Sequence, residues 1–238
     1  MIPLRDDNPT DLPPILTVTF LVLCSLVFLY EASLPPELEH RLIEHYGAIP
    51  ASILSSAAVS VAATPAIPPM LTLITSMFLH GGWMHLIGNM LYLWIFGNNI
   101  EDALGHMRFA LFYLVCGIAA AFSHAFTDPT SSIPMVGASG AISGVLGAYL
   151  LLYPRAQVLV LIPLGFYTRT VYVPAAVVLG FWFLLQLLSG TASLGHEGGG
   201  VAFFAHIGGF LAGILLVGPL KRPEVPWFAP GHSHPRSR

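Results

Sequence analysis

The sequence predicts an all-α membrane protein whose main body is a bundle of six transmembrane helices. Of its 238 residues, 55% are hydrophobic and only 9% are charged, whereas soluble domains carry about 25% charged residues. The mean hydropathy is +0.75. The apolar residues gather in runs that approach the roughly 20 residues a spanning helix needs.

Six apolar runs are the predicted spans. The second, fourth and fifth are short, but further apolar residues flank each of them. Short helices are tolerated where protein or a water-filled cavity surrounds their ends. The predicted spans are residues 15–34, 83–98, 107–126, 139–153, 172–188 and 201–220. Between the first two, the long loop 31–80 is expected to hold short interfacial helices.

Basic residues set the predicted orientation. With a cytoplasmic N-terminus, every Lys and Arg except Arg41 lies on the inner side, as the positive-inside rule requires. We therefore predict a cytoplasmic segment over 1–14, the helical domain over 15–220 and a mobile cytoplasmic tail, containing Pro and His, over 221–238. The compact chain, with no evident import signal, favours a bacterial inner membrane.

Composition and motifs exclude several classes of function. A net charge of -3 with 9 Lys and Arg leaves no basic face for nucleic acid. Cys24 and Cys116 lie in apolar runs and are expected to pack rather than to pair. His196-Glu197 lacks the second histidine of a helical zinc-protease motif, and no spanning segment carries paired aspartates.

A serine at the start of the fourth span is the candidate nucleophile. It lies in Gly137-Ala138-Ser139-Gly140. At 1.5 Å per residue, Ser139 is about 21 Å from the inner end of its span, and the hydrocarbon core is about 30 Å thick. The serine is therefore expected below the outer surface. A lone membrane serine usually only bonds a carbonyl of its own helix.

His206 in the sixth span is the candidate base. Ser139 and His206 lie equally far from the inner ends of their spans, which predicts matching depth. Ionisable residues at such depth are rare and mark candidate sites, although a packing histidine is the alternative. Imidazole can activate a serine near neutral pH. All 12 Asp and Glu residues are assigned to loops or tails, so we predict a Ser-His dyad whose ring is oriented by packing.

Paired glycines predict that these two spans approach closely. Gly140 and Gly144 are spaced by four residues, and so are Gly209 and Gly213. Small residues at this spacing let the backbones of membrane helices come together. Each pair begins just after a candidate catalytic residue, so packing these faces together would bring the serine and the histidine within reach.

The second span supplies candidate donors for an oxyanion. His85 and Asn89 are spaced by four residues and share a helical face, while His80 is expected to support the preceding loop. With the backbone N–H of Ser139, these groups could stabilise a developing oxyanion. The alternatives are a polar seam between helices and a metal or haem site built from His80, His85 and His206.

Taken together, these residues resemble the rhomboid family of intramembrane serine proteases. The likeness covers about residues 75–218. The residues that carry it are His80, His85, Asn89, Gly137-Ala138-Ser139-Gly140, Ala205-His206-Ile207-Gly208-Gly209 and Gly213, with Glu101 at the acidic position after the second span.

The resemblance implies a six-helix rhomboid bundle without a cofactor. It implies Ser139 as nucleophile, His206 as general base and acid, and His85, Asn89 and the serine N–H around the oxyanion. Two departures stand out. Leu71-Thr72 replaces a common Trp-Arg pair in the outer loop, and Ser143 replaces an aromatic that often helps to fix the histidine ring.

The expected function is hydrolysis of peptide bonds in membrane-anchored proteins within the lipid bilayer. Water is expected to enter beside the fifth span, where Phe181, Trp182 and Phe183 either gate the path or simply pack. The chief alternative is a non-proteolytic rhomboid-like protein that binds or escorts transmembrane helices. A small-molecule channel or transporter is a more distant one. The sequence does not indicate an oligomeric state.

Overall fold

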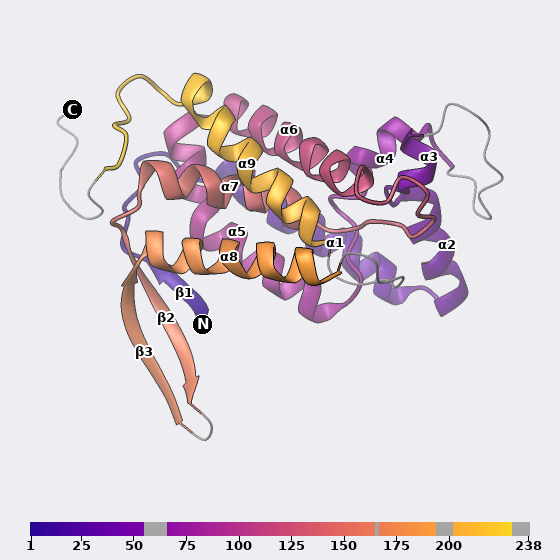
Figure 1. The fold of residues 1–238 in the computed structure, drawn as a ribbon, viewed down its shortest axis with the longest axis horizontal. Coiled ribbons are helices and arrows are strands. Elements are labelled where there is room, and N and C mark those ends of the chain that lie inside the picture. The colour runs from indigo at the N-terminus through magenta and orange to yellow at the C-terminus, as the bar shows by residue number, and fades with distance from the viewer. Residues whose placement is uncertain (55–65, 165–166, 194–201, 230–238) are drawn as a thin grey trace.

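Six long helices lie side by side in the computed structural model, which describes residues 1–54, 66–164, 167–193 and 202–229 (Figure 1). Each overlaps one predicted span, so the all-α membrane fold is confirmed. Within the described residues, four of them (α1, α6, α8 and α9) are long and apolar enough to cross a membrane by themselves. The six are α1 (Ile15–Ser33), α5 (Trp83–Leu104), α6 (His106–Ala125), α7 (Ser139–Leu152), α8 (Ala175–Ser193) and α9 (Phe203–Leu220).

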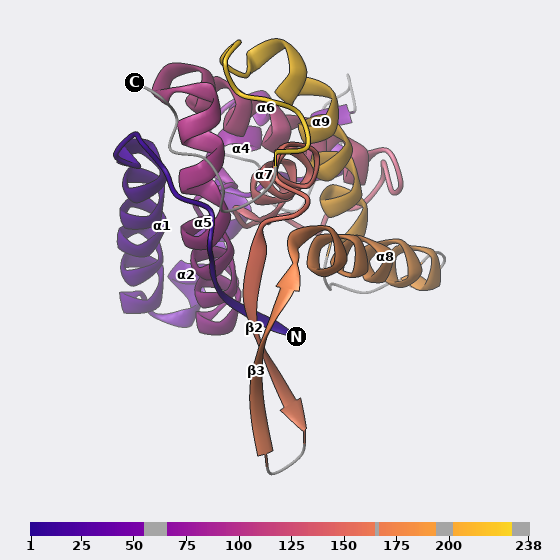
Figure 2. The same ribbon diagram turned by 90° about the vertical axis from the view of Figure 1, so that its left-hand side faces the viewer.

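Helix α7 occupies the centre of the bundle. The end-on view in Figure 2 shows α5, α6, α9 and α8 arranged around it, and most residues of α7 are buried. Helix α1 packs on α5 at one side, while α8 lies at the opposite edge with an exposed apolar face. A helix that is apolar all round needs such a central position or a lipid environment.

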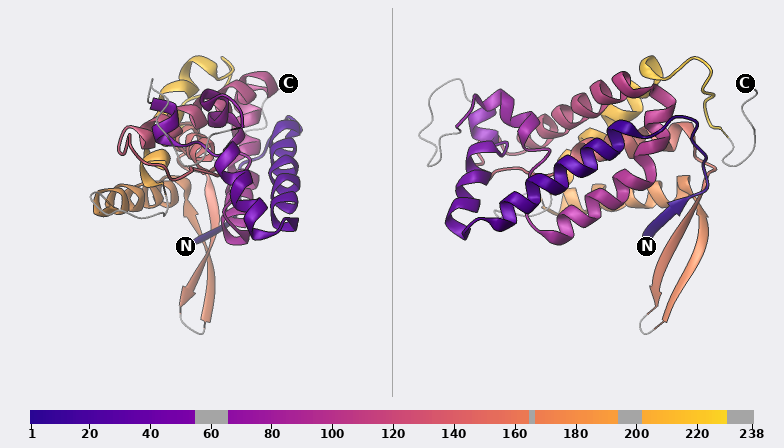
Figure 3. Two further views of the ribbon diagram at one scale, coloured as in Figure 1. Left: turned by 90° about the vertical axis from the view of Figure 1, so that its right-hand side faces the viewer. Right: turned by 180° about the vertical axis from the view of Figure 1, so that it is seen from behind.

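Three short helices fold the long outer loop. They are α2 (Pro36–Tyr46), α3 (Pro50–Leu54) and α4 (Pro69–Thr75), and they gather at the end of the bundle away from the N-terminus and the end of α9 (Figures 1 and 3). Proline in the first turn of α2 and α4 suits its fixed φ. The loop that leads to α7 is tied to this layer, because Ala48 and Met135 exchange two backbone hydrogen bonds of 3.0 and 2.8 Å. The expected short helices in this loop are therefore present.

A small sheet at the other end of the bundle was missed by the sequence analysis. Its strands β1 (Ile2–Asp6), β2 (Gln157–Leu164) and β3 (Tyr167–Pro174) pair antiparallel in the order β1-β2-β3. The β2–β3 hairpin connects α7 to α8 and projects away from the helices (Figures 1 and 2). The fifth span therefore begins at Ala175 rather than 172, because the preceding residues belong to β3.

The start of the predicted mobile tail packs against the bundle. The backbone N–H of Ala229 donates to the carbonyl of Leu152 at the end of α7, at 2.7 Å. Because such contacts hold residues 222–229 in place, the prediction of mobility is wrong for this part. Residues 230–238, which contain His232 and His234, lie outside the described residues.

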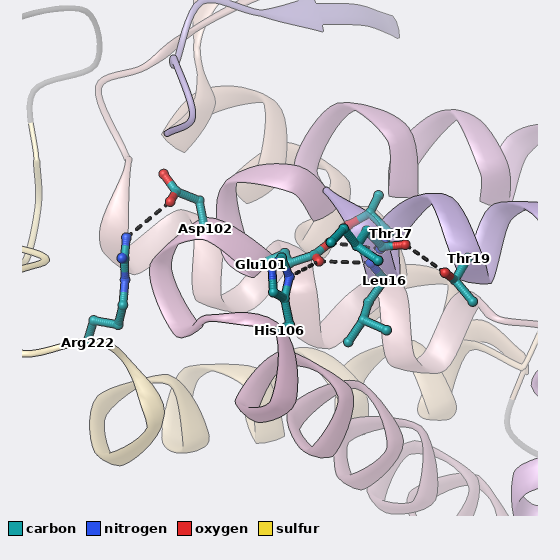
Figure 4. Close-up of polar contacts among 8 residues, drawn as sticks. Leu16, Thr17, Thr19, Glu101, Asp102, His106 and Arg222 are labelled. Carbon is teal, nitrogen blue, oxygen red and sulfur yellow. Dashed lines mark hydrogen bonds and ion pairs between the residues drawn. The ribbon is translucent and has the colours of Figure 1, made fainter. Parts of the chain in front are cut away.

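Glu101 holds the start of α1 against the end of α5 (Figure 4). Its buried carboxylate accepts the backbone N–H groups of Leu16 and Thr17, both at 2.8 Å, and lies 2.6 Å from Nδ1 of His106. Carboxylates at a helix N-terminus satisfy free N–H groups and complement the dipole. The assignment of all acidic residues to loops or tails is wrong, because three of them are buried in helices: Glu31, Glu101 and Asp102.

Replacing Glu101 by glutamine is expected to lower the free energy of unfolding by about 1–3 kcal/mol, because a neutral amide accepts fewer and weaker hydrogen bonds. Thermal unfolding of the purified protein in detergent measures the loss. Glu37→Gln is the matched control, since Glu37 is exposed in the first turn of α2 and should change stability by less than about 0.5 kcal/mol. Equal effects of both variants would contradict the capping role.

A pH dependence is expected from Asp6 in β1, which accepts a hydrogen bond from the Tyr149 hydroxyl. Burial raises the pKa of Asp6 from its ordinary 3.8 to about 6, although the tyrosine bond opposes the shift. The folded protein thus holds this proton more tightly than the unfolded chain. The contribution of protonated Asp6 to the free energy of unfolding is largest below pH 3.8, and it is lost as the pH rises through about 6.

Asp6→Asn removes this titration. As the pH rises from 4 to 7, the free energy of unfolding of the variant should increase by about 1–3 kcal/mol relative to that of the wild type. Above pH 7 the difference between the two free energies should stay constant. Melting temperatures of both proteins across this range provide the measurement. A constant difference at every pH would contradict the raised pKa.

Candidate active site

Ser139 and His206 meet at the end of the bundle that holds the outer loop. Ser139 is the first residue of α7 and His206 lies in the first turn of α9. Nε2 of His206 is 2.9 Å from Oγ of Ser139, which is hydrogen-bonding distance. The matching depth expected from the sequence is therefore realised in the fold, and a serine hydroxyl faces a ring nitrogen that can take its proton.

The two glycine pairs allow this approach. A Cβ on Gly209 would collide with the carbonyl oxygen of Gly140, and one on Gly213 would collide with that of Gly144. Helix α9 thus lies directly on the backbone of α7, as the spacing predicted. The contact is not symmetrical, because the missing Cβ positions of Gly140 and Gly144 lie closest to α6 side chains. The glycines therefore fit three helices together.

Gln186 in α8 is the site residue that the sequence analysis missed. Its Oε1 lies 2.7 Å from Nδ1 of His206, so the ring is hydrogen-bonded at both nitrogens. The expectation that packing alone orients the ring is wrong. A signal was present in the sequence, since an amide within the apolar run of the fifth span is unusual and marks a candidate site.

Trp182 is the aromatic residue that packs beside the His206 ring, in place of the aromatic that Ser143 replaces. The indole ring centre is 5.8 Å from that of His206, whereas the Ser143 hydroxyl donates to the carbonyl of Ser139 at 2.6 Å. Of the three aromatics considered as a gate, Trp182 packs on α9 and Phe183 stacks there on Phe210, with ring centres 4.3 Å apart. Of the three, Phe181 alone has a largely exposed side chain.

Gly137 lets the loop before Ser139 approach α5 closely. Its φ of +120° is unfavourable for other residues. A Cβ at this position would lie 2.7 Å from the His85 ring and 3.6 Å from Nδ2 of Asn89. The loop can therefore pass closely over both side chains. The backbone N–H of Gly137 donates to the carbonyl of Ser76 at 2.8 Å, which fixes the loop.

His85 and Asn89 both direct donors toward this loop. The N–H of Gly81 donates to Nδ1 of His85 at 3.3 Å, so the ring proton resides on Nε2, beside Gly137. Nδ2 of Asn89 is buried and has no hydrogen-bond partner among the described residues. The N–H of Ser139 lies in the first turn of α7, where helix donors are free and the dipole favours negative charge.

His80 lies in the segment that precedes α5, and its contacts join this segment to α1. Its backbone N–H donates to the buried carboxylate of Glu31, and its Nδ1 donates to the carbonyl of Phe78, both at 3.2 Å. Its ring centre is 5.2 Å from that of His85. In the part of the chain that the structure describes, no three metal-binding side chains converge, so the three-histidine alternative has no geometric support.

Comparison with known proteins assigns the chain to a family. The rhomboid domain model matches residues 69–223. The chain belongs to the rhomboid family. RHOMBOID-like protein 5 of Arabidopsis thaliana is 32% identical over 164 residues, which cover 68% of this chain and 48% of that protein. Rhomboid protease GluP of Bacillus subtilis is 35% identical over 60% of this chain and 25% of its own length.

Rhomboid protein 1 of Saccharomyces cerevisiae, a mitochondrial protein, is 31% identical over 61% of this chain and 40% of its own. This rhomboid thus spans less than half the length of each of these three relatives. Of these three, one is named a protease, one a rhomboid protein and one a rhomboid-like protein. Because several are mitochondrial or chloroplastic by name, the expected bacterial inner membrane is not supported, whereas a membrane location is.

Proposed function

We propose that this rhomboid is an intramembrane serine endopeptidase that cleaves membrane-anchored proteins. The observation that carries the proposal is the 2.9 Å contact between Ser139 Oγ and His206 Nε2. This contact lies between two apolar helices rather than on an aqueous surface. A serine paired with an imidazole is an established route to a nucleophile near neutral pH.

In the proposed reaction, Ser139 Oγ attacks the carbonyl carbon of a substrate peptide bond while its proton passes to Nε2 of His206. The C–N bond of the resulting tetrahedral intermediate then breaks, and the imidazolium gives the proton to the departing amine. Water, deprotonated by the same imidazole, attacks the acyl-serine ester. The serine is regenerated and the new carboxylate leaves.

Three donors surround the place where the substrate oxygen gains charge in this reaction. They are Nδ2 of Asn89, Nε2 of His85 and the N–H of Ser139. The close approach of Asn89 and His85 to Gly137 and the free amide hydrogens of Asn89 support this role. Donors held in place before the reaction cost no reorganisation when charge develops.

The proposed substrates are proteins with a transmembrane helix. At about 1.5 Å per residue, the 14 residues of α7 place Ser139 about 21 Å from the other end of that helix, so the hydroxyl lies below the membrane surface. A peptide bond must therefore enter the bilayer to reach it. A helical bond is shielded by its own backbone, so the substrate must locally unwind.

Both termini are proposed to face the cytoplasm. The N-terminal strand β1 and the C-terminal end of α9 lie at the same end of the bundle (Figure 1), opposite Ser139 at the start of α7. Arg5, Arg155 and Lys221 lie near this end, and basic residues near span ends favour the inner side of a membrane.

Cleavage of tagged single-span proteins in proteoliposomes tests the proposed function. The wild type should release fragments cut within or beside the span, and Ser139→Ala should release none. Equal cleavage by both proteins would refute the nucleophile. If the wild type binds these proteins without cleaving any, the non-proteolytic alternative is favoured.

A further inference from the structure

We infer that Gln186 is a positioning residue that sets the proton arrangement and the orientation of His206. The inference rests on the proposed function for its catalytic consequence, although the hydrogen bond itself is a feature of the fold. Gln186 lies in α8, a different helix from both members of the dyad. Its carbonyl oxygen is 2.7 Å from Nδ1 of His206.

The acceptor fixes which ring nitrogen carries the proton. An amide oxygen only accepts, so Nδ1 of His206 must be the donor in this contact. In the neutral ring, Nε2 then has its lone pair free and faces Ser139 Oγ at 2.9 Å. This is the tautomer that a general base needs. The opposite tautomer would point an N–H at the serine and could not take its proton.

The orientation of the amide is itself held. Nε2 of Gln186 donates to the carbonyl of Trp182, one turn earlier in α8, at 3.4 Å. The amide oxygen is thereby directed toward His206. The indole of Trp182 also packs beside the imidazole. One turn of α8 thus provides both a hydrogen-bond acceptor and an apolar wall for the same ring.

A neutral acceptor suits this position. Among the described residues, the His206 ring nitrogens make hydrogen-bond contacts with Ser139 and Gln186, and neither of these residues is acidic. A carboxylate in a protein interior carries a large desolvation cost, which an amide avoids. The amide can still select the tautomer, but it stabilises the imidazolium less than a carboxylate would.

The location of Gln186 links the base to the edge of the bundle. Helix α8 is at the periphery (Figure 2), and its outer face exposes Phe181, Leu184 and Leu185. Outward movement of α8 would withdraw Gln186 and Trp182 from His206 together. The dyad is therefore correctly arranged only while α8 is packed against α9.

Three variants and two measurements test the inference. Gln186→Leu keeps the bulk and removes the acceptor, Gln186→Glu keeps an acceptor, and Leu185→Ala changes the exposed outer face of α8 as a matched control. Nitrogen NMR of ¹⁵N-histidine-labelled protein reports the tautomer, with the His206 signals identified by their loss in His206→Ala. Substrate cleavage reports kcat and KM.

The wild type should show a protonated Nδ1 and an unprotonated Nε2 at His206. Gln186→Leu should give mixed tautomers and lower kcat by about 10- to 100-fold with little change in KM. Gln186→Glu should restore the wild-type tautomer, and Leu185→Ala should match the wild type in both measurements.

An unchanged His206 tautomer in Gln186→Leu would overturn the inference, whatever the activity. A wild type that shows the expected tautomer but cleaves nothing would instead count against the proposed function. Loss of activity in Leu185→Ala equal to that in Gln186→Leu, with the tautomer retained in both, would show that α8 acts through packing alone and would also overturn it.

Discussion

His206→Ala is expected to reduce substrate cleavage by at least about 10⁴-fold, because the serine then has no base to take its proton. The residual rate should come from substrate binding and the oxyanion donors alone. Both kcat and kcat/KM should fall together, since the proton transfer occurs only in the reaction. Cleavage rates in proteoliposomes at matched protein amounts provide the measurement.

His40→Ala is the control for this loss. His40 is highly exposed in α2 and pairs only with Glu44 of the same helix among the described residues, so its removal should leave cleavage unchanged. Thermal unfolding shows whether His206→Ala remains folded, and His206→Gln offers a second variant of more similar size. A folded variant that lacks the imidazole and cleaves at even a tenth of the wild-type rate would contradict its role as the base.

Gly213→Ala is expected to destabilise the bundle by about 2–4 kcal/mol, near the upper end for an overpacked core. The added methyl group would collide with three backbone atoms of Gly144. Backbone cannot swing aside as a flexible side chain can, so α7 and α9 would have to separate. Their separation would also pull Ser139 away from His206, and activity should fall with stability.

Gly180→Ala provides the same chemical change where there is room. Among the described residues, no atom apart from the adjoining residues and backbone of α8 itself lies within 4 Å of the Cβ position of Gly180, and alanine favours helix more than glycine does. Its melting temperature should equal or exceed that of the wild type. If Gly213→Ala were as stable as Gly180→Ala, the close glycine contact between α7 and α9 would not exist in solution.

The helical part of the fold could be predicted because span length and apolar composition are local properties. The proximity of Ser139 and His206 could also be predicted, since equal distances along two helices that run in the same direction mean equal depth. The glycine spacing indicated which faces meet. The spacing did not indicate that Gly140 and Gly144 also pack against α6. A spacing of four residues identifies one face of a helix, but not how many neighbouring helices contact that face.

The hairpin was missed for a different reason. Strand β2 is a short run rich in Val, Leu and Ile. Periodicity alone does not distinguish such a run from an apolar loop or from the end of a transmembrane segment. Its identity depends on pairing with β1, more than a hundred residues earlier in the chain. The role of Glu101 was missed likewise, because a buried carboxylate is stabilised here by its contacts with α1 and with His106 in α6, which the sequence does not show.

Gln186 shows the limit of the sequence at the site itself. Acidic residues are the usual partners of a catalytic histidine, and Gln186 is a neutral amide. Whether Gln186 faces lipid or the bundle depends on how α8 is rotated about its axis. The leucines next to Gln186 in the sequence do not show which face of the helix is buried. The 2.7 Å contact with His206 settles the direction in which that side chain points.

The central claim is that the His206 imidazole makes Ser139 nucleophilic. A fluorophosphonate probe, which reacts covalently with activated serines, tests it without knowledge of a natural substrate. After incubation with the purified protein in membranes, peptide mass spectrometry should find the adduct on Ser139 in the wild type and none in folded His206→Ala. No adduct on Ser139 in the wild type, or equal labelling in the two proteins, would contradict the claim.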